Sequence, residues 1–173
     1  MMMDPTADPF AAPAPDADAP VERFGAKDAN DLSWANLLNA YTCTECGRCT
    51  SECPANLTGK KLSPRKIMMD TRDRIEEIGV NIAANGSFLD DGKSLLGDYI
   101  TNEELWACTS CNACVQACPV DIDPLNIIMK LRNFATMEES SAPGALNAMM
   151  TNVENNGAPW PFNQMDRANW INE

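Results

Sequence analysis

CTECGRCTSECP at residues 43–54 and CTSCNACVQACP at residues 108–119 are two copies of one spacing, C-x2-C-x2-C-x3-C-P. Three thiolates separated by two residues each can wrap three irons of one cubane from a tight turn. The fourth cysteine and its proline lead the chain away, toward the other cluster. The doubled motif therefore predicts two [4Fe-4S] clusters held by all eight cysteines.

Crossed ligation assigns each cluster three cysteines from one motif and the fourth from the other. The first cluster is expected on Cys43, Cys46, Cys49 and Cys118, and the second on Cys108, Cys111, Cys114 and Cys53. The alternative is a pair of zinc sites with four thiolates each, in a structural or interaction module without a redox role. Zinc sites usually use separated C-x2-C pairs rather than a triplet with a distal Cys-Pro, so the pattern favours iron and sulfur.

Charge and composition exclude several other functions. The 173-residue chain contains no histidine, which excludes Rieske centres, histidine-ligated haem and histidine-dependent acid–base catalysis on it. Its net charge of −12 argues against binding to nucleic acid or to an anionic membrane surface. It favours a partner with a basic face.

The sequence also predicts where the protein works. It contains no apolar run long enough to span a membrane, and residues 1–5 lack the basic and apolar regions of a secretory signal. The expected compartment is the reducing cytoplasm, with peripheral association with a membrane complex left open. Cysteines in that compartment bind metal more often than they form disulfides.

The chain is expected to divide into three parts. Residues 1–30 form a disordered, acidic, Ala/Pro-rich tail, residues 31–138 a dicluster [4Fe-4S] domain, and residues 139–173 a C-terminal helix with an irregular tail. Within the central part, aligning Pro64 with Pro124 also pairs Arg72 with Arg132. Because each of these helices follows a cysteine motif, the repeat predicts a mainly α-helical ferredoxin fold with a pseudo-two-fold axis around the two clusters.

Local signals predict the individual helices. An apolar stripe of Trp34, Leu37, Leu38 and Tyr41 leads into Cys43. Ser-Pro at 63–64 begins a helix that Gly79 should end, and residues 79–100 are expected to be a connecting loop that could hold a short hairpin. Further helices are expected at a capping box at 101–104, from Asp-Pro at 123–124 to about residue 137, and from residue 143, the last with these side chains inward: Leu146, Met149, Met150 and Val153.

The ligand count limits the chemistry. Two four-thiolate clusters use every cysteine, so no thiol remains for a nucleophile or a redox disulfide. We therefore expect electron transfer rather than bond-making chemistry, with no substrate site on this chain. Candidate residues around the clusters, equally well explained as ordinary core, are Trp106, Ile122, Ile67 and Ile127.

A basic stretch interrupts the acidic chain between residues 60 and 74. We interpret it as a solvated helix face, with an entry face for an acidic electron donor as the alternative. Its members are Lys60, Lys61, Arg65, Lys66, Arg72 and Arg74.

The two motifs, together with LWACTSC at 105–111 and IIMKLR at 127–132, resemble the C subunit of heterodisulfide reductase. They are also similar to the α-helical ferredoxin domains of succinate dehydrogenase-type iron–sulfur subunits and of the anaerobic glycerol-3-phosphate dehydrogenase C subunit. The resemblance covers about residues 34–137. It implies an electron-transfer subunit of a multi-subunit oxidoreductase, linked to a flavoprotein or a membrane quinone pool.

LSPRKI at 62–67 and ENNGAPW at 154–160 resemble a region of fused iron–sulfur oxidoreductases that precedes a catalytic domain with paired Cys-Cys-Gly motifs. No adjacent cysteines occur here, so the resemblance implies that the catalytic domain is a separate subunit. Residues 143–173 are a candidate docking segment for it, with Trp160, Phe162 and Trp170 as anchors. The alternative is that these aromatic side chains pack on the chain's own core.

Overall fold

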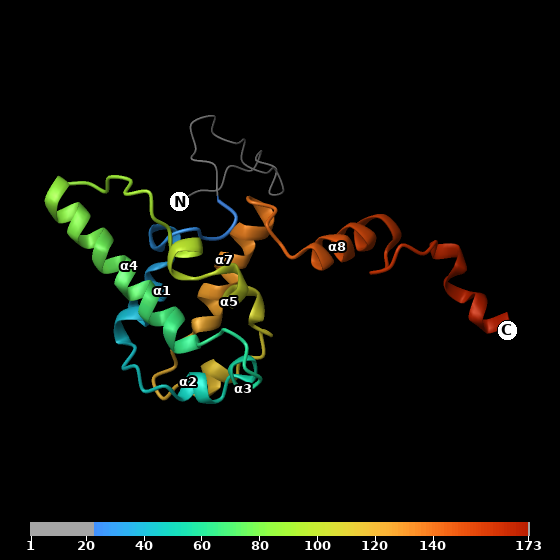
Figure 1. The fold of residues 1–173 in the computed structure, drawn as a ribbon, viewed down its shortest axis with the longest axis horizontal. Coiled ribbons are helices and arrows are strands. Elements are labelled where there is room, and N and C mark those ends of the chain that lie inside the picture. The colour runs from blue at the N-terminus through green and yellow to red at the C-terminus, as the bar shows by residue number, and fades with distance from the viewer. Residues whose placement is uncertain (1–22, 173) are drawn as a thin grey trace, which may run out of the picture.

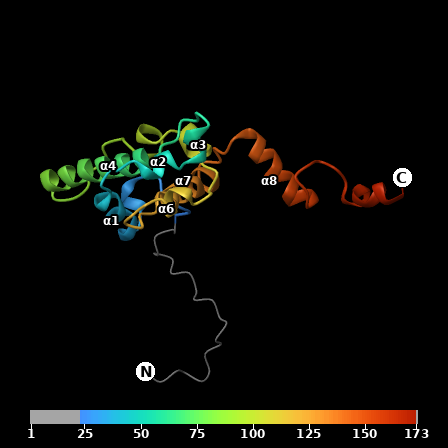
Figure 2. The ribbon, with the colours of Figure 1, turned by 90° about the horizontal axis from the view of Figure 1, so that it is seen from below.

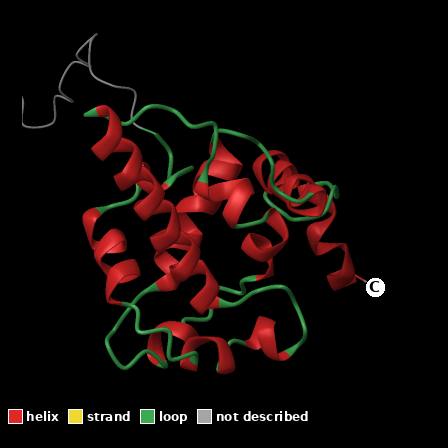
Figure 3. Ribbon diagram, turned by 60° about the vertical axis from the view of Figure 1, so that its left-hand side comes forward, coloured by secondary structure: helices red, strands yellow, loops and turns green. Residues whose placement is uncertain are grey.

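The computed structural model describes residues 23–172, and helices and loops make up this part of the chain (Figures 1 and 3). Its longest helices are α4 (Pro64–Asn85), α7 (Pro124–Met137) and α8 (Gly144–Asn156). The shorter α-helices are α1 (Trp34–Thr42), α2 (Arg48–Ser51), α3 (Pro54–Leu57), α5 (Asn102–Ala107) and α6 (Ala113–Gln116). Over these residues the only β pairing is an isolated bridge between Leu96 and Ile100, which confirms the mainly α fold class.

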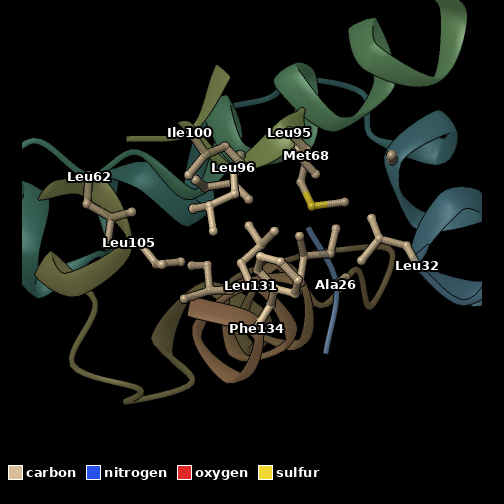
Figure 4. Packing of buried hydrophobic residues seen from close by; sticks show 14 of the residues in the cluster. Ala26, Leu32, Leu62, Met68, Leu95, Leu96, Ile100, Leu105, Leu131 and Phe134 are labelled. Carbon is tan, nitrogen blue, oxygen red and sulfur yellow. The ribbon is translucent and has the colours of Figure 1, made fainter. Parts of the chain in front are cut away.

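The pseudo-repeat is built on α4 and α7, which pack against each other in the core. Both begin as the sequence predicts. Ser63 accepts a hydrogen bond from the Lys66 amide, Asp123 accepts one from the Asn126 amide, and a proline occupies the first turn of each helix. Figure 4 shows Met68 of α4 meeting Leu131 and Phe134 of α7, with Leu95, Leu96 and Ile100 packed above them.

The predicted end of α4 at Gly79 is wrong. The helix continues to Asn85 and ends at Gly86, which adopts a left-handed conformation with φ of 78°. A glycine inside a helix costs only about 1 kcal/mol relative to alanine, and no proline follows Gly79 to stop the helix. The hairpin is also absent from residues 86–100, where Leu95–Tyr99 instead form a single wide turn that buries Leu95 and Leu96.

Helix α1 leads into Cys43 as predicted but buries a different face. Trp34 remains 77% exposed, and Leu38 and Tyr41 are also exposed. The buried side chains are Asn36 and Ala40, and Asn36 Nδ2 donates to Asn126 Oδ1 of α7 at 3.1 Å. A polar pair that joins two distant segments therefore overrides the apolar stripe.

The folded part also begins earlier than residue 31. Ala26 and Ala29 are buried, and the Ala26 amide donates to the Lys130 carbonyl of α7 at 3.1 Å. Residues 23–30 thus pack on the domain, and their predicted place in the disordered tail is wrong. The remainder of that predicted tail, residues 1–22, lies outside the described part of the chain.

Helix α8 has its predicted position, but its apolar side chains do not face inward. None of its residues is buried, and the helix leads the chain away from the rest of the structure (Figures 1 and 2). Beyond it, Trp160, Phe162 and Trp170 are 65%, 72% and 74% exposed. The alternative that these aromatic side chains pack on the chain's own core is therefore wrong. Between residues 23 and 172, no helix has both the length and the hydrophobicity to cross a bilayer.

Candidate iron–sulfur centre

The two cysteine motifs form the same local structure. In each, a helix (α1 or α5) ends at the residue before the first cysteine, and a one-turn helix (α2 or α6) carries the third. The intervening residues share an unusual backbone, with left-handed φ values at equivalent positions: 57° at Glu45 and 55° at Ser110, then 80° at Gly47 and 62° at Asn112. The repeat read from the sequence therefore extends to the backbone angles of the loops that carry the thiols.

A small hollow lies inside the first loop, and Cys43, Cys46, Cys49 and Cys118 all line it. Cys118 belongs to the second motif, so the fold brings a thiol from one repeat to the loop of the other. The other lining residues include Met68, Pro119, Val120, Ile122 and Pro124. Four thiols around an apolar hollow are a donor set that fits a [4Fe-4S] cluster.

The second loop lies close to the first because α2 packs against α6. Cys114 is buried, which raises its pKa, and the nearby Cys108 and Cys49 thiols raise that pKa further. Cys53 is also buried, at the start of α3, and is part of the hydrophobic core. In residues 23–172, no three Cys, Asp or Glu side chains are close enough together to hold one metal ion.

The protein environment acts on the thiols in two opposite ways. Burial raises the pKa of Cys114 to about 11 and raises that of Cys49, so both thiols hold their protons at neutral pH. Hydrogen bonds favour the thiolate form of other cysteines. The Ala113 amide and the Thr109 side chain both lower the pKa of Cys111. The Ile122 amide donates to Cys118 Sγ at 3.3 Å and the Ser110 amide to Cys108 Sγ at 3.4 Å. Metal binding at the buried thiols must therefore release protons.

The side chains predicted to surround the centre lie near it to different degrees. Ile67, Ile122 and Ile127 are buried, and Ile122 lines the hollow. Trp106 is partly buried, and its indole N–H has no acceptor among the described residues. Two arginines that the sequence analysis did not assign to the site also contact it. Arg72 donates a hydrogen bond to the first loop and Arg132 donates one to the second. Their equivalent positions in the repeat alignment were the sequence signal that could have identified them.

Comparison with known proteins agrees with this geometry. Residues 42–122 match the family model of the 4Fe-4S dicluster domain. Over 88% of its length the chain is 35% identical to the probable iron-sulfur-binding oxidoreductase FadF of Bacillus subtilis, covering 26% of that protein. It is 32% identical, also over 88% of its length, to the EtfAB:quinone oxidoreductase of Syntrophomonas wolfei, covering 24% of that protein.

A third relative matches a shorter region. It is the C subunit of the ferredoxin/F(420)H(2)-dependent CoB-CoM heterodisulfide reductase of Methanosarcina acetivorans, 34% identical over 63% of this chain and 54% of its own length. The chain thus spans about a quarter of the first two relatives and about half of the third. Residues 42–122 therefore form a 4Fe-4S dicluster domain, and the chain that carries it is homologous to the iron–sulfur C subunits of heterodisulfide reductases.

Proposed function

We propose that this chain is a non-catalytic subunit that passes single electrons through two [4Fe-4S] clusters within a multi-subunit oxidoreductase. Bound clusters of this kind supply reversible one-electron chemistry. The thiols hold them, the apolar side chains of the hollow limit water access, and backbone N–H groups such as that of Ile122 stabilise charge on sulfur.

The observation that carries the proposal is the hollow that gathers three thiols of the first motif with Cys118 of the second. It supports a first cluster on Cys43, Cys46, Cys49 and Cys118. By the pseudo-symmetry of the loops, we assign the second to Cys108, Cys111, Cys114 and Cys53. The packing of α2 against α6 favours electron exchange between the two, because it keeps their loops adjacent.

The proposed electron route runs between a flavoprotein or quinone-linked partner and a separate catalytic subunit with Cys-Cys-Gly motifs. The names of the relatives support a quinone-linked partner and a multi-subunit reductase, since one is an EtfAB:quinone oxidoreductase and another is the C subunit of a heterodisulfide reductase. The Cys-Cys-Gly subunit is proposed from the resemblance of residues 62–67 and 154–160. We place the assembly in the cytoplasm or at the periphery of a membrane complex.

Paired alanine variants test the ligand sets. Under crossed ligation, Cys43 and Cys118 serve the same cluster, so the C43A/C118A chain should keep one cluster, about four irons per chain. Cys43 and Cys53 serve different clusters, so C43A/C53A should lose both. The measurement is iron and acid-labile sulfide per chain after anaerobic reconstitution, with the wild-type chain expected to hold about eight irons.

The opposite pattern would show that each motif ligates its own cluster. In that case C43A/C53A would keep about four irons and C43A/C118A none. Stoichiometric zinc in place of iron in every variant would instead support a structural module without a redox role.

A further inference from the structure

Equivalent arginines of the two repeats reach equivalent positions of the two cysteine loops. Arg72 on α4 forms an ion pair with Glu45 through its Nη2 atom. Arg132 on α7 donates from Nη1 to Ser110 Oγ at 3.3 Å. Glu45 and Ser110 are each the third residue of their motif and share the left-handed backbone conformation. One arginine therefore meets a carboxylate where the other meets a hydroxyl.

The remaining partners of Arg132 are also uncharged. Its Nη2 donates to the carbonyl oxygens of Cys108 at 2.5 Å and Leu105 at 2.8 Å, and the guanidinium lies 5.0 Å from the centre of the Trp106 ring. Within residues 23–172, no carboxylate lies within ion-pair distance of it. Burial lowers the pKa of Arg132, yet an arginine remains protonated at neutral pH.

The second loop is thus next to a full positive charge that is partly shielded from water. At the first loop the matching charge of Arg72 is neutralised by Glu45. Arg65 also lines the hollow there, but it is exposed, and water and salt screen an exposed charge. Arg48 and Glu52 of the first motif also face uncharged counterparts, Ala113 and Ala117, but both are exposed and screened in the same way. Glu45 and Ser110 are the positions where a charge difference between the motifs meets a partly buried arginine.

We propose that Arg132 is a positioning residue that raises the reduction potential of the cluster bound by the Cys108 loop, and that Glu45 removes this effect at the Cys43 loop. A cluster gains a negative charge on reduction, so a nearby cation stabilises its reduced form. The inference rests on the proposed two-cluster function. It adds that the electrostatic difference between the repeats gives the two clusters different reduction potentials, although their ligand spacing is identical.

Exchanging the two loop residues tests this. Ser110→Glu supplies Arg132 with the carboxylate that Arg72 already has, and Glu45→Ser removes that carboxylate from the first loop. Glutamate and serine each occur natively at one of these equivalent left-handed positions, so neither exchange introduces a new backbone demand. We expect S110E to lower the reduction potential of the cluster at the Cys108 loop and E45S to raise that of the cluster at the Cys43 loop.

The readout is an EPR-monitored redox titration of the full, anaerobically reconstituted chain. At a fixed ambient potential, S110E should reduce the ratio of reduced to oxidised cluster at the Cys108 loop about tenfold, equal to about 59 mV for a one-electron couple. Arg132→Gln should shift the same cluster in the same direction, and Arg132→Lys should shift it less because the charge is kept. Arg167→Gln is the matched control, since it removes the same charge from the C-terminal segment.

The outcomes separate the inference from the proposed function. Two clusters that titrate as in the wild type in S110E and E45S would overturn the inference and leave the two-cluster function intact, as would shifts in the opposite directions. A wild-type chain that binds no cluster would instead overturn the proposed function. If R132Q fails to assemble a cluster, the S110E and E45S titrations decide.

Discussion

At the residue scale, Arg74 is a fully buried charged side chain outside the cysteine loops, and a buried charge needs partners of opposite charge. Its guanidinium donates to Asp28 at 2.7 Å, to Asp91 at 2.6 Å and to the Lys93 carbonyl at 2.8 Å. It thereby joins the N-terminal segment, α4 and the loop that follows α4. The same contact holds the pKa of Asp91 at about 2, so this ion pair is lost only as the pH falls from about 4 toward 2.

Replacing Arg74 with methionine should lower the free energy of unfolding by about 3–5 kcal/mol, because it leaves Asp28 and Asp91 without their cation in a largely buried site. Anaerobic chemical denaturation followed by circular dichroism measures the loss. Lys93→Gln is the control: it breaks only the exposed pair with Glu77 and should cost less than about 1 kcal/mol. Equal costs for the two variants would contradict this role of Arg74.

The role of a residue could be predicted from the sequence only where that role depends on the spacing of nearby residues. Two short motifs are enough to propose all eight cysteines as ligands, and four of these cysteines line one hollow. The prediction of a solvated basic face is wrong for Arg74, since its partners lie 46 and 17 residues away in sequence. Local charge and periodicity contain no information about such distant pairing.

At the element scale, predictions are correct where they depend on neighbouring residues and wrong where they depend on residues distant in sequence. Both repeat helices begin where a capping residue followed by proline predicts, because an N-cap bond is made within four residues of chain. The buried face of α1 could not be predicted because it depends on Asn126, 90 residues away. The N-terminal segment gives no sequence signal because its residues are small and become buried only against α7.

Gly25 is the residue that lets this segment dock. Its φ is +92°, and a Cβ atom there would lie 2.3 Å from the Lys130 carbonyl oxygen. Gly25→Ala should therefore cost about 2–4 kcal/mol through backbone strain and displacement of the segment from α7. Gly59→Ala separates the two causes, because Gly59 has a φ of +79° but no atom within 4 Å of the added Cβ. It should cost only about 1–2 kcal/mol. Equal losses in both variants, measured by the same denaturation, would show that the clash is unimportant.

At the scale of the whole molecule, a packed domain around the cysteine loops continues into a C-terminal segment, residues 144–172, that leads away from it (Figure 1). We infer that this segment binds the catalytic subunit, because large exposed aromatic side chains are typical interface anchors. The W160A/W170A double variant should weaken co-purification with that subunit at least about tenfold. Trp34→Ala removes an equally exposed tryptophan from α1 and is the matched control. Unchanged binding by W160A/W170A would rule the docking role out.

We expect this fold to hold two [4Fe-4S] clusters for one-electron transfer. Low-temperature EPR of the full chain, purified without oxygen and reduced with dithionite, tests it most directly when combined with metal analysis. We predict about eight irons per chain and the spectrum of two magnetically interacting reduced clusters. A silent spectrum from protein that carries stoichiometric zinc would show that the cysteines form zinc sites instead.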